Sequence, residues 1–213
     1  MKTLALELST VRGSLAWVDE SVADFAQEWR NDRRNSAVFF ENLNAVTEKF
    51  GAPDTIIVGL GPGSYAGTRI AISAAIGLQV SSGALLIGFP SICAMKCDAD
   101  EYCVIGDARR KSFFFARIRA NDVAEGPTLF SESELKSELG AIEKGTPIFT
   151  PDSLPQFERA VACFPSALVL GRLARARQHR FSFPPLEPIY LREPHITMPT
   201  RSVGNLADKG TSG

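Results

Sequence analysis

The sequence predicts an α/β protein of two lobes, each built on a mixed β-sheet. Two continuous apolar runs bounded by glycine, at residues 55–60 and 84–88, are typical of strands buried on both faces of a sheet. Between Phe39 and Phe50, apolar side chains recur at the spacing of one helix face. The second half of the chain repeats this mixture in shorter elements, which predicts a smaller, degenerate second lobe.

The first half of the chain predicts the order β-β-β-α-β-α-β. Alternating residues on either side of a polar turn indicate a hairpin near the N-terminus. Asn35 or Ser36 is expected to cap the first long helix, and Gly51 to end it. The expected elements are strands at 3–8, 14–18, 22–29, 55–60 and 84–88, helices at 35–50 and 68–81, and a short helix that opens at 90–91.

The second half is expected to add strands at 102–107, 113–118, 147–150 and 188–191, with helices at 133–139 and 166–178. This order places the first lobe, with its glycine-rich loop and first two helices, at residues 1–98 and the second at 99–192. Residues 193–213 are polar and contain several glycines. They are expected to form a tail that is partly disordered or packs back on the first lobe.

Composition argues against several classes of protein. The net charge of −1 excludes a broad basic field that would hold nucleic acid. No apolar segment is long enough to span a membrane, and Glu7 interrupts the short apolar N-terminus, so a cytoplasmic protein is expected. The four cysteines lack a Cys-x-x-Cys spacing and only two histidines are present, which predicts free thiols and no zinc site.

A glycine-rich turn at residues 61–67 follows the apolar run at 55–60. Such a turn between a strand and a helix suggests phosphate binding, because backbone N–H groups and the helix dipole favour anions. A P-loop is not expected, because Gly67 is followed by Thr68 where that motif requires lysine.

Two other glycine motifs fit this turn only in part. Gly61, Gly63 and Ala66 match the spacing of a dinucleotide-binding fingerprint. Pro62 stiffens that turn, however, and the next strand ends without the acid that would hold a ribose. A nucleophilic Ser64 is poorly supported, because glycine is missing two residues to either side of it.

Five segments, in order along the chain, resemble the TsaB family. The longest is residues 59–70, which is similar to the family signature GPGSFTGLRI. The other four are Glu7-Leu8-Ser9-Thr10 for DTST, Arg33-Arg34-Asn35-Ser36 for Arg-x-His-Ser, Asp107-Ala108-Arg109 for DAR, and Pro188-Ile189-Tyr190-Leu191-Arg192 for PxYLR. The chain departs from the family at Glu7, at Leu8 and at residues 66–68, which weakens the case for a nucleotide contact at the first hairpin.

The resemblance implies an actin-like fold of the ribonuclease H-like (ASKHA) type, in the glycoprotease-like branch of that superfamily. It implies a non-catalytic scaffold subunit of the complex that makes threonylcarbamoyladenosine (t6A) in tRNA. The implied partners are a TsaD-type catalytic paralogue, a TsaE-type ATPase and, through the complex, tRNA. An isolated chain would form a homodimer. No resident cofactor is implied, and ATP or ADP at the partner interface stays open.

The resemblance also argues against catalysis by this chain. The catalytic paralogue holds a metal through a His-x-x-x-His pair on its early helix, where this chain has Asn35 and Phe39. No catalytic residue and no metal site are therefore expected. The alternative is a self-sufficient actin-like enzyme, either a glycoprotease-like peptidase or a small-molecule kinase.

Two groups of residues are expected to form the functional surface. The first two helices are expected to bind the partner through Arg34, Ser36, Phe39, Phe40, Leu43, Ile70, Ser73, Ala74 and Gly77. The glycine-rich loop is expected at the subunit junction, with Gly61, Pro62, Gly63, Ser64, Gly67 and Arg69. The alternative for both groups is packing within the chain. Adjacent helical residues point about 100° apart, so either Phe39 or Phe40 is expected to face outward.

The remaining charged motifs favour structural roles. Asp107 and Arg109 are expected to form an internal ion pair or a turn. A basic stretch at the end of the last helix is typical of a solvated helix C-terminus, with a tRNA phosphate contact as the alternative. It comprises Arg172, Arg175, Arg177, His179 and Arg180.

Overall fold

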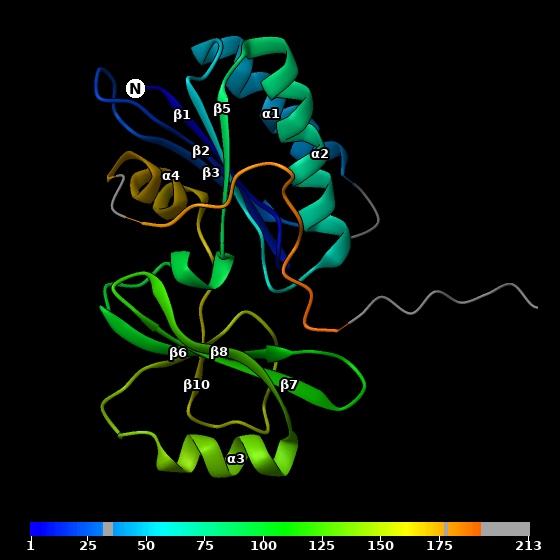
Figure 1. Cartoon of the computed structure of the whole chain (residues 1–213), viewed down its shortest axis with the longest axis vertical. Helices are drawn as coiled ribbons and strands as arrows, with labels where there is room; N and C mark the ends of the chain where they lie inside the picture. Colours follow the sequence, from blue (N-terminus) through cyan, green and yellow to red (C-terminus); the bar gives the residue numbers. More distant parts are fainter. Residues whose placement is uncertain (32–35, 177–178, 193–213) are drawn as a thin grey trace, which may run out of the picture.

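The computed structural model describes residues 1–31, 36–176 and 179–192, and shows two lobes stacked along the long axis of the molecule (Figure 1). Each lobe contains one five-stranded mixed sheet, with the strand orders β3-β2-β1-β4-β5 and β10-β9-β6-β7-β8. The predicted α/β fold with two mixed sheets is therefore confirmed. Arg34, Asn35, Arg177 and the predicted tail at 193–213 lie outside the described residues.

The first sheet is central to the first lobe, and its core strands are buried on both faces. Every residue of β1 and β4 is buried, as their continuous apolar sequences predict. The elements of this lobe are β1 (Thr3–Glu7), β2 (Arg12–Val18), β3 (Phe25–Arg30), α1 (Ala37–Phe50), β4 (Thr55–Gly59), α2 (Tyr65–Ser82), β5 (Leu85–Phe89), η1 (Ser91–Ala94) and α4 (Ala167–Ala176).

Helices cover both faces of this sheet (Figure 1). Alternate residues of β1 point to opposite sides, so Leu4 and Leu6 pack under α1 and α2, while Ala5 faces α4. Small residues let α4 approach closely: a Cβ on Gly171 would lie 2.7 Å from Val18 Cγ2. The predicted division of the chain needs correction here, because α4 packs on β1 and β2 and so belongs to the first lobe, although residues 99–192 were assigned to the second.

The second lobe consists of β6 (Glu101–Asp107), β7 (Ser112–Arg119), β8 (Asp122–Ser131), α3 (Glu132–Ala141), β9 (Ile148–Thr150) and β10 (Ala160–Ala162). One face of its sheet packs on α3, around Ile105, Phe115 and Leu135. The other face, through Val104 and Phe114, shares a core with α4 and the first lobe. The two lobes are thus joined by a continuous apolar core and not only by their connections.

The structure differs from the predicted elements in three places. β8 was not predicted, because it is an exposed edge strand interrupted at Gly126 and Pro127 and lacks an apolar pattern. β10, which is only three residues long, was also missed. The predicted strand at 188–191 is wrong: only one backbone hydrogen bond, from Ile189 N to Leu60 O at 2.8 Å, joins this segment to the end of β4.

Candidate functional site

α1 places its two adjacent phenylalanines in different surroundings. Phe39 is 1% exposed, with its ring centroid 6.4 Å from that of Trp29, whereas Phe40 is 49% exposed and its ring centroid lies 5.0 Å from that of Phe39. The prediction that one of the pair faces outward is confirmed. Phe39 and Leu43, both expected at the partner interface, instead lie in the core against the first sheet. The apolar side of α1 packs against its own sheet. Of the two phenylalanines, Phe40 is therefore the one exposed for contact with a partner.

α2 continues this outer surface with a mixture of small and apolar residues. Ile76 and Val80 are 44% and 82% exposed, and a Cβ on Gly77 would meet no atom within 4 Å. Ile70 and Ala74, also expected at the interface, are half-buried and pack against the core. The outer residues of the two helices are called the α1/α2 face: Val38, Phe40, Ser73, Ile76, Gly77 and Val80.

The remaining predicted residue of α1, Ser36, occupies the N-cap position without making a side-chain capping bond. Its hydroxyl is therefore not used to hold the helix start. Ser64, by contrast, caps α2: its Oγ accepts a hydrogen bond from Gly67 N at 3.3 Å. This cap explains why α2 begins at Tyr65, three residues before the predicted start.

The glycine-rich loop packs directly on the turn that follows β1. A Cβ on Gly63 would lie 2.1 Å from Ser9 O, and one on Gly67 would lie 2.1 Å from Leu8 O. Ser64 N donates to Ser9 O at 2.5 Å, which fixes the two turns against each other. These two glycines are therefore required by close backbone packing, the structural alternative considered for them.

Gly61 anchors the other end of the loop. Its φ of +90° is a conformation that favours glycine, and its N–H donates to Ser91 Oγ at 2.9 Å. Ser91 N donates in return to Gly61 O at 2.8 Å. The loop is thus held at both ends before any ligand or partner is considered.

Glu7 lies beneath the loop and is completely buried. Its Oε1 accepts a hydrogen bond from Ser9 N at 2.6 Å, and a Cβ on Gly59 would lie 1.8 Å from its Oε2. Burial raises the pKa of the Glu7 carboxyl, an effect partly opposed by hydrogen bonds from Ser9 and Ser91. Burial thus disfavours the charged form of this carboxyl, and its Oε2 has no hydrogen-bond partner among the described residues.

A cleft of about 200 Å³ separates the glycine-rich loop from the second lobe. Ser9 and Thr10 line it from the first lobe, and the turn between β6 and β7 lines it from the second. In that turn Arg109 Nη1 lies 3.2 Å from Asp107 Oδ2. The expected pairing of Asp107 and Arg109 is confirmed, and both side chains meet at the wall of the cleft.

Two tyrosines that the sequence did not single out stand at the mouth of this cleft. The rings of Tyr65 and Tyr190 lie 5.2 Å apart, and Arg69 both hydrogen-bonds the Tyr65 hydroxyl and lies over its ring. Arg69 is thereby directed along the surface of α2 and not across to an acid. Tyr190 could have been noticed in the sequence, because it belongs to the Pro188–Arg192 motif. Its contact with Tyr65 of α2 could not, because it depends on how the chain returns from the last helix to the first lobe.

The predicted basic stretch is divided among separate contacts. Arg172 Nε lies 3.0 Å from Asp24 Oδ2 and His179 Nδ1 lies 3.3 Å from Asp122 Oδ2. The His179 ring also packs against Phe89 at 5.5 Å. These contacts support a structural role for Arg172 and His179.

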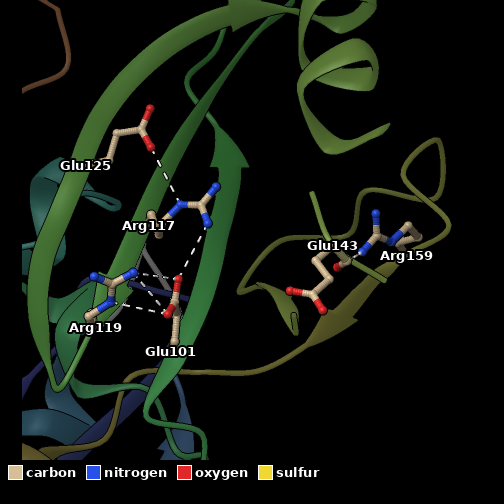
Figure 2. Close-up of polar contacts among 6 residues, drawn as sticks. All are labelled: Glu101, Arg117, Arg119, Glu125, Glu143 and Arg159. Carbon is tan, nitrogen blue, oxygen red and sulfur yellow. Dashed lines mark hydrogen bonds and ion pairs between the residues drawn. The ribbon is translucent and has the colours of Figure 1, made fainter. Parts of the chain in front are cut away.

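Three arginines of the second lobe, Arg117, Arg119 and Arg159, form ion pairs or hydrogen bonds within the chain (Figure 2). Arg117 lies 3.5 Å from Glu101 and 3.6 Å from Glu125, and Arg119 lies 3.2 Å from Glu101. Arg159 donates to the carbonyls of Leu139, Ile142 and Glu143 at the end of α3. Local charge on this lobe is therefore largely paired or used in helix capping.

Within residues 1–31, 36–176 and 179–192, no cluster of three or more His, Cys, Asp or Glu side chains is placed to hold a metal. None of the helices described there is long and apolar enough to cross a membrane. Cys93, Cys97, Cys103 and Cys163 are free thiols, as predicted.

The sequence matches no family model and no curated protein. Two solved structures from Pseudomonas aeruginosa are similar to it. One, described as an uncharacterized protein with similarity to the peptidase YeaZ, is 20% identical and gives a TM-score of 0.69 over 90% of this chain and 99% of its own. The other, YeaZ (also called TsaB), is 18% identical, with a TM-score of 0.66 over 83% and 92% of the two chains. The chain therefore has the fold of YeaZ, which is the actin-like fold expected from the TsaB resemblance.

Proposed function

We propose that this chain is a non-catalytic subunit of a cytoplasmic complex that makes threonylcarbamoyladenosine in tRNA. It binds a TsaD-type catalytic paralogue through the α1/α2 face, and a TsaE-type ATPase completes the machinery. The observation that carries the proposal is the unpaired apolar surface of α1 and α2 on a YeaZ-like fold. Five sequence segments that resemble TsaB, in the same order, support the same assignment.

The chemistry of the α1/α2 face suits a helical partner. Phe40 projects from α1 as an aromatic anchor, and Gly77 leaves open space on α2 beside Ile76. A partner helix can place bulky side chains over such small residues and bury Phe40 against its own surface. Contiguous apolar side chains at the surface of a globular protein commonly mark such an interface.

The cleft supports a scaffold role better than catalysis. Ser64 Oγ is engaged in capping α2, and Glu7 is sealed under the glycine-rich loop. Of the two histidines in the sequence, His179 packs between aromatic rings and His195 lies outside the described residues. A serine nucleophile needs a base within hydrogen-bond reach, and no cleft-lining residue that the structure describes is a histidine.

The decisive experiment is co-purification of the full chain with a TsaD-type paralogue. Phe40→Glu is expected to reduce capture at least tenfold, because a charge would have to be buried at the interface. Val161→Glu is the control, since Val161 is also an exposed apolar side chain but lies in β10 of the second lobe. Equal capture of both variants would contradict the proposed interface.

The same preparation separates the scaffold from the alternative enzyme. The chain alone is expected to neither hydrolyse nucleotide nor cleave peptides, whereas adding it to the paralogue, the ATPase, tRNA and an activated threonylcarbamoyl donor should restore t6A formation. Robust turnover by the lone chain, unaffected by Phe40→Glu, would instead support a self-sufficient kinase or peptidase.

A further inference from the structure

The two chain segments that connect the lobes run antiparallel to each other. One leaves η1 for β6 at residues 95–100, and the other leaves β10 for α4 at 163–166. Met95 and Pro165 form an isolated antiparallel bridge between them. Backbone hydrogen bonds flank this pair: Lys96 N to Phe164 O at 3.0 Å and Ser166 N to Ala94 O at 2.9 Å.

Two cysteines lie close to this bridge. Cys97 lies two residues after Met95 and Cys163 two residues before Pro165, so continuing the same pairing by two residues would set them opposite each other. Directly opposite residues that do not exchange hydrogen bonds have Cα atoms about 4.5 Å apart in a regular ladder. Disulfides span Cα distances of about 4.4–6.8 Å, so this position suits a cross-link.

Side-chain contacts agree with the register. Cys163 Sγ donates to Lys96 O at 3.6 Å, the carbonyl of the peptide group whose nitrogen belongs to Cys97. The chain turns locally there, with Cys97 N donating to Met95 O at 2.9 Å. Both cysteines pack into the apolar core shared by the two lobes. Cys93 belongs to the same core but lies within η1, outside the paired register.

We propose that Cys97 and Cys163 form a reversible disulfide that clasps the two connections between the lobes, with a hydroperoxide as the oxidant. The Cys97 thiolate attacks a peroxide oxygen, the O–O bond breaks, and Cys97 sulfenic acid and water form. Cys163 then attacks that sulfur, the S–S bond forms, and hydroxide leaves and is protonated to a second water. Two thiols and one hydrogen peroxide thus give one disulfide and two waters.

The burial of the two thiols indicates which of them is oxidised first. Cys97 is half-buried and Cys163 is buried, so Cys97 is the thiol that meets the oxidant first. A cleft of about 150 Å³ lined by Arg12, Lys96 and Cys163 opens beside the second thiol. Burial raises the pKa of both thiols, which makes oxidation slow at neutral pH and faster as the pH rises.

The disulfide would join the two segments that connect the lobes and so restrict movement of one lobe relative to the other. It also closes a long loop that contains the whole second lobe, which restricts the unfolded chain. A rise of roughly 5–10 °C in the midpoint of thermal unfolding is therefore expected on oxidation. This inference does not depend on the proposed function, because it concerns the lone chain.

The test treats the full chain with hydrogen peroxide, blocks remaining thiols after denaturation, and maps the peptides by mass spectrometry without and with reduction. The expected result is a Cys97–Cys163 linked peptide that dithiothreitol removes, together with the rise in unfolding midpoint. Cys97→Ser and Cys163→Ser should each abolish both signals.

Cys93→Ser is the matched control and should keep the linked peptide. The proposal is overturned if Cys93 replaces either partner in the linked peptide, if Cys97 proceeds to sulfinic acid without a disulfide, or if all four thiols stay reduced. A disulfide only between separate chains, seen as a dimer on non-reducing gels, would overturn it as well.

Discussion

Glu7 shows how burial changes the properties of a single carboxyl group. Its side chain is enclosed by Gly59 and the turn at Ser9. Burial is the main cause of its raised pKa. The carboxyl accepts a hydrogen bond from Ser9 N and so helps to hold the turn that the glycine-rich loop packs against.

Glu7→Gln is expected to change how stability depends on pH. Because the pKa of Glu7 is raised in the folded state, the unfolded chain releases the proton first, and stability falls as pH rises above the ordinary glutamate pKa of 4.5 until the folded-state pKa is passed. The variant lacks this loss, so its stability relative to the wild type should increase from pH 4 to pH 8. Urea unfolding from pH 4 to 8 measures the difference, and parallel curves would contradict the prediction.

Substitution by alanine is expected to lower the stability of the protein at Gly63 and to raise it at Gly77. Gly63→Ala would place a methyl group 2.1 Å from Ser9 O in a backbone conformation with φ of +159°, so a loss of about 2–4 kcal/mol is expected. Gly77→Ala meets no atom within 4 Å and lies inside α2, so a gain of about 0.5–1 kcal/mol is expected. Thermal unfolding of both variants checks this, and equal effects would be inconsistent with the packing described.

At the scale of elements, helix boundaries follow local capping. α2 starts where Ser64 caps it, and α3 starts with a complete capping box, in which the side chains of Ser131 and Glu134 bond each other's backbone N–H groups. α3 has 10 residues, compared with 14 in α1 and 18 in α2. The backbone groups at its ends are therefore a larger share of the helix, and its stability depends more on capping.

Ser131→Ala is expected to destabilise the protein by about 1 kcal/mol, because Glu134 N loses its capping partner. The matched control is Ser137→Ala, an exposed position in the middle of the same helix, where alanine should be neutral or slightly stabilising. Chemical denaturation compares the two. If Ser137→Ala lowered the free energy of unfolding as much as Ser131→Ala, the loss at Ser131 could not be attributed to capping.

At the scale of the whole molecule, the layers formed by the described residues leave apolar side chains of α1 and α2 exposed, among them Phe40, Ile76 and Val80. The first sheet is buried by α1 and α2 on one side and by α4 with the second lobe on the other, so the outer sides of α1 and α2 face solvent. An exposed apolar surface of this kind can be buried against a complementary surface, including the same surface on a second copy of the chain.

The isolated chain is therefore expected to dimerise in a concentration-dependent manner through the α1/α2 face. Phe40→Glu should shift the equilibrium to monomer, while Val161→Glu, in β10 of the second lobe, should leave it unchanged. Sedimentation velocity over a range of concentrations measures both. A wild-type chain that stays monomeric at high concentration would contradict this prediction without bearing on binding of the paralogue.

The sequence by itself determined the central strands and the main helices. Apolar runs such as residues 55–60 and the helical stripe ending at Phe50 report burial directly, because local pattern and burial coincide there. The glycine-rich loop was recognisable for the same reason. The order of its glycines is tied to a backbone that must turn and pack closely on Ser9.

Only the tertiary structure decided which residues remain at the surface and which lobe each late element joins. Phe39 and Phe40 are identical in type, and their fates differ because the sheet lies on one side of α1 alone. α4 returns to the first lobe because small residues there admit a helix, and Cys163 reaches the Lys96 carbonyl because two distant connections pair. Such outcomes depend on contacts between segments far apart in the chain, which no local pattern encodes.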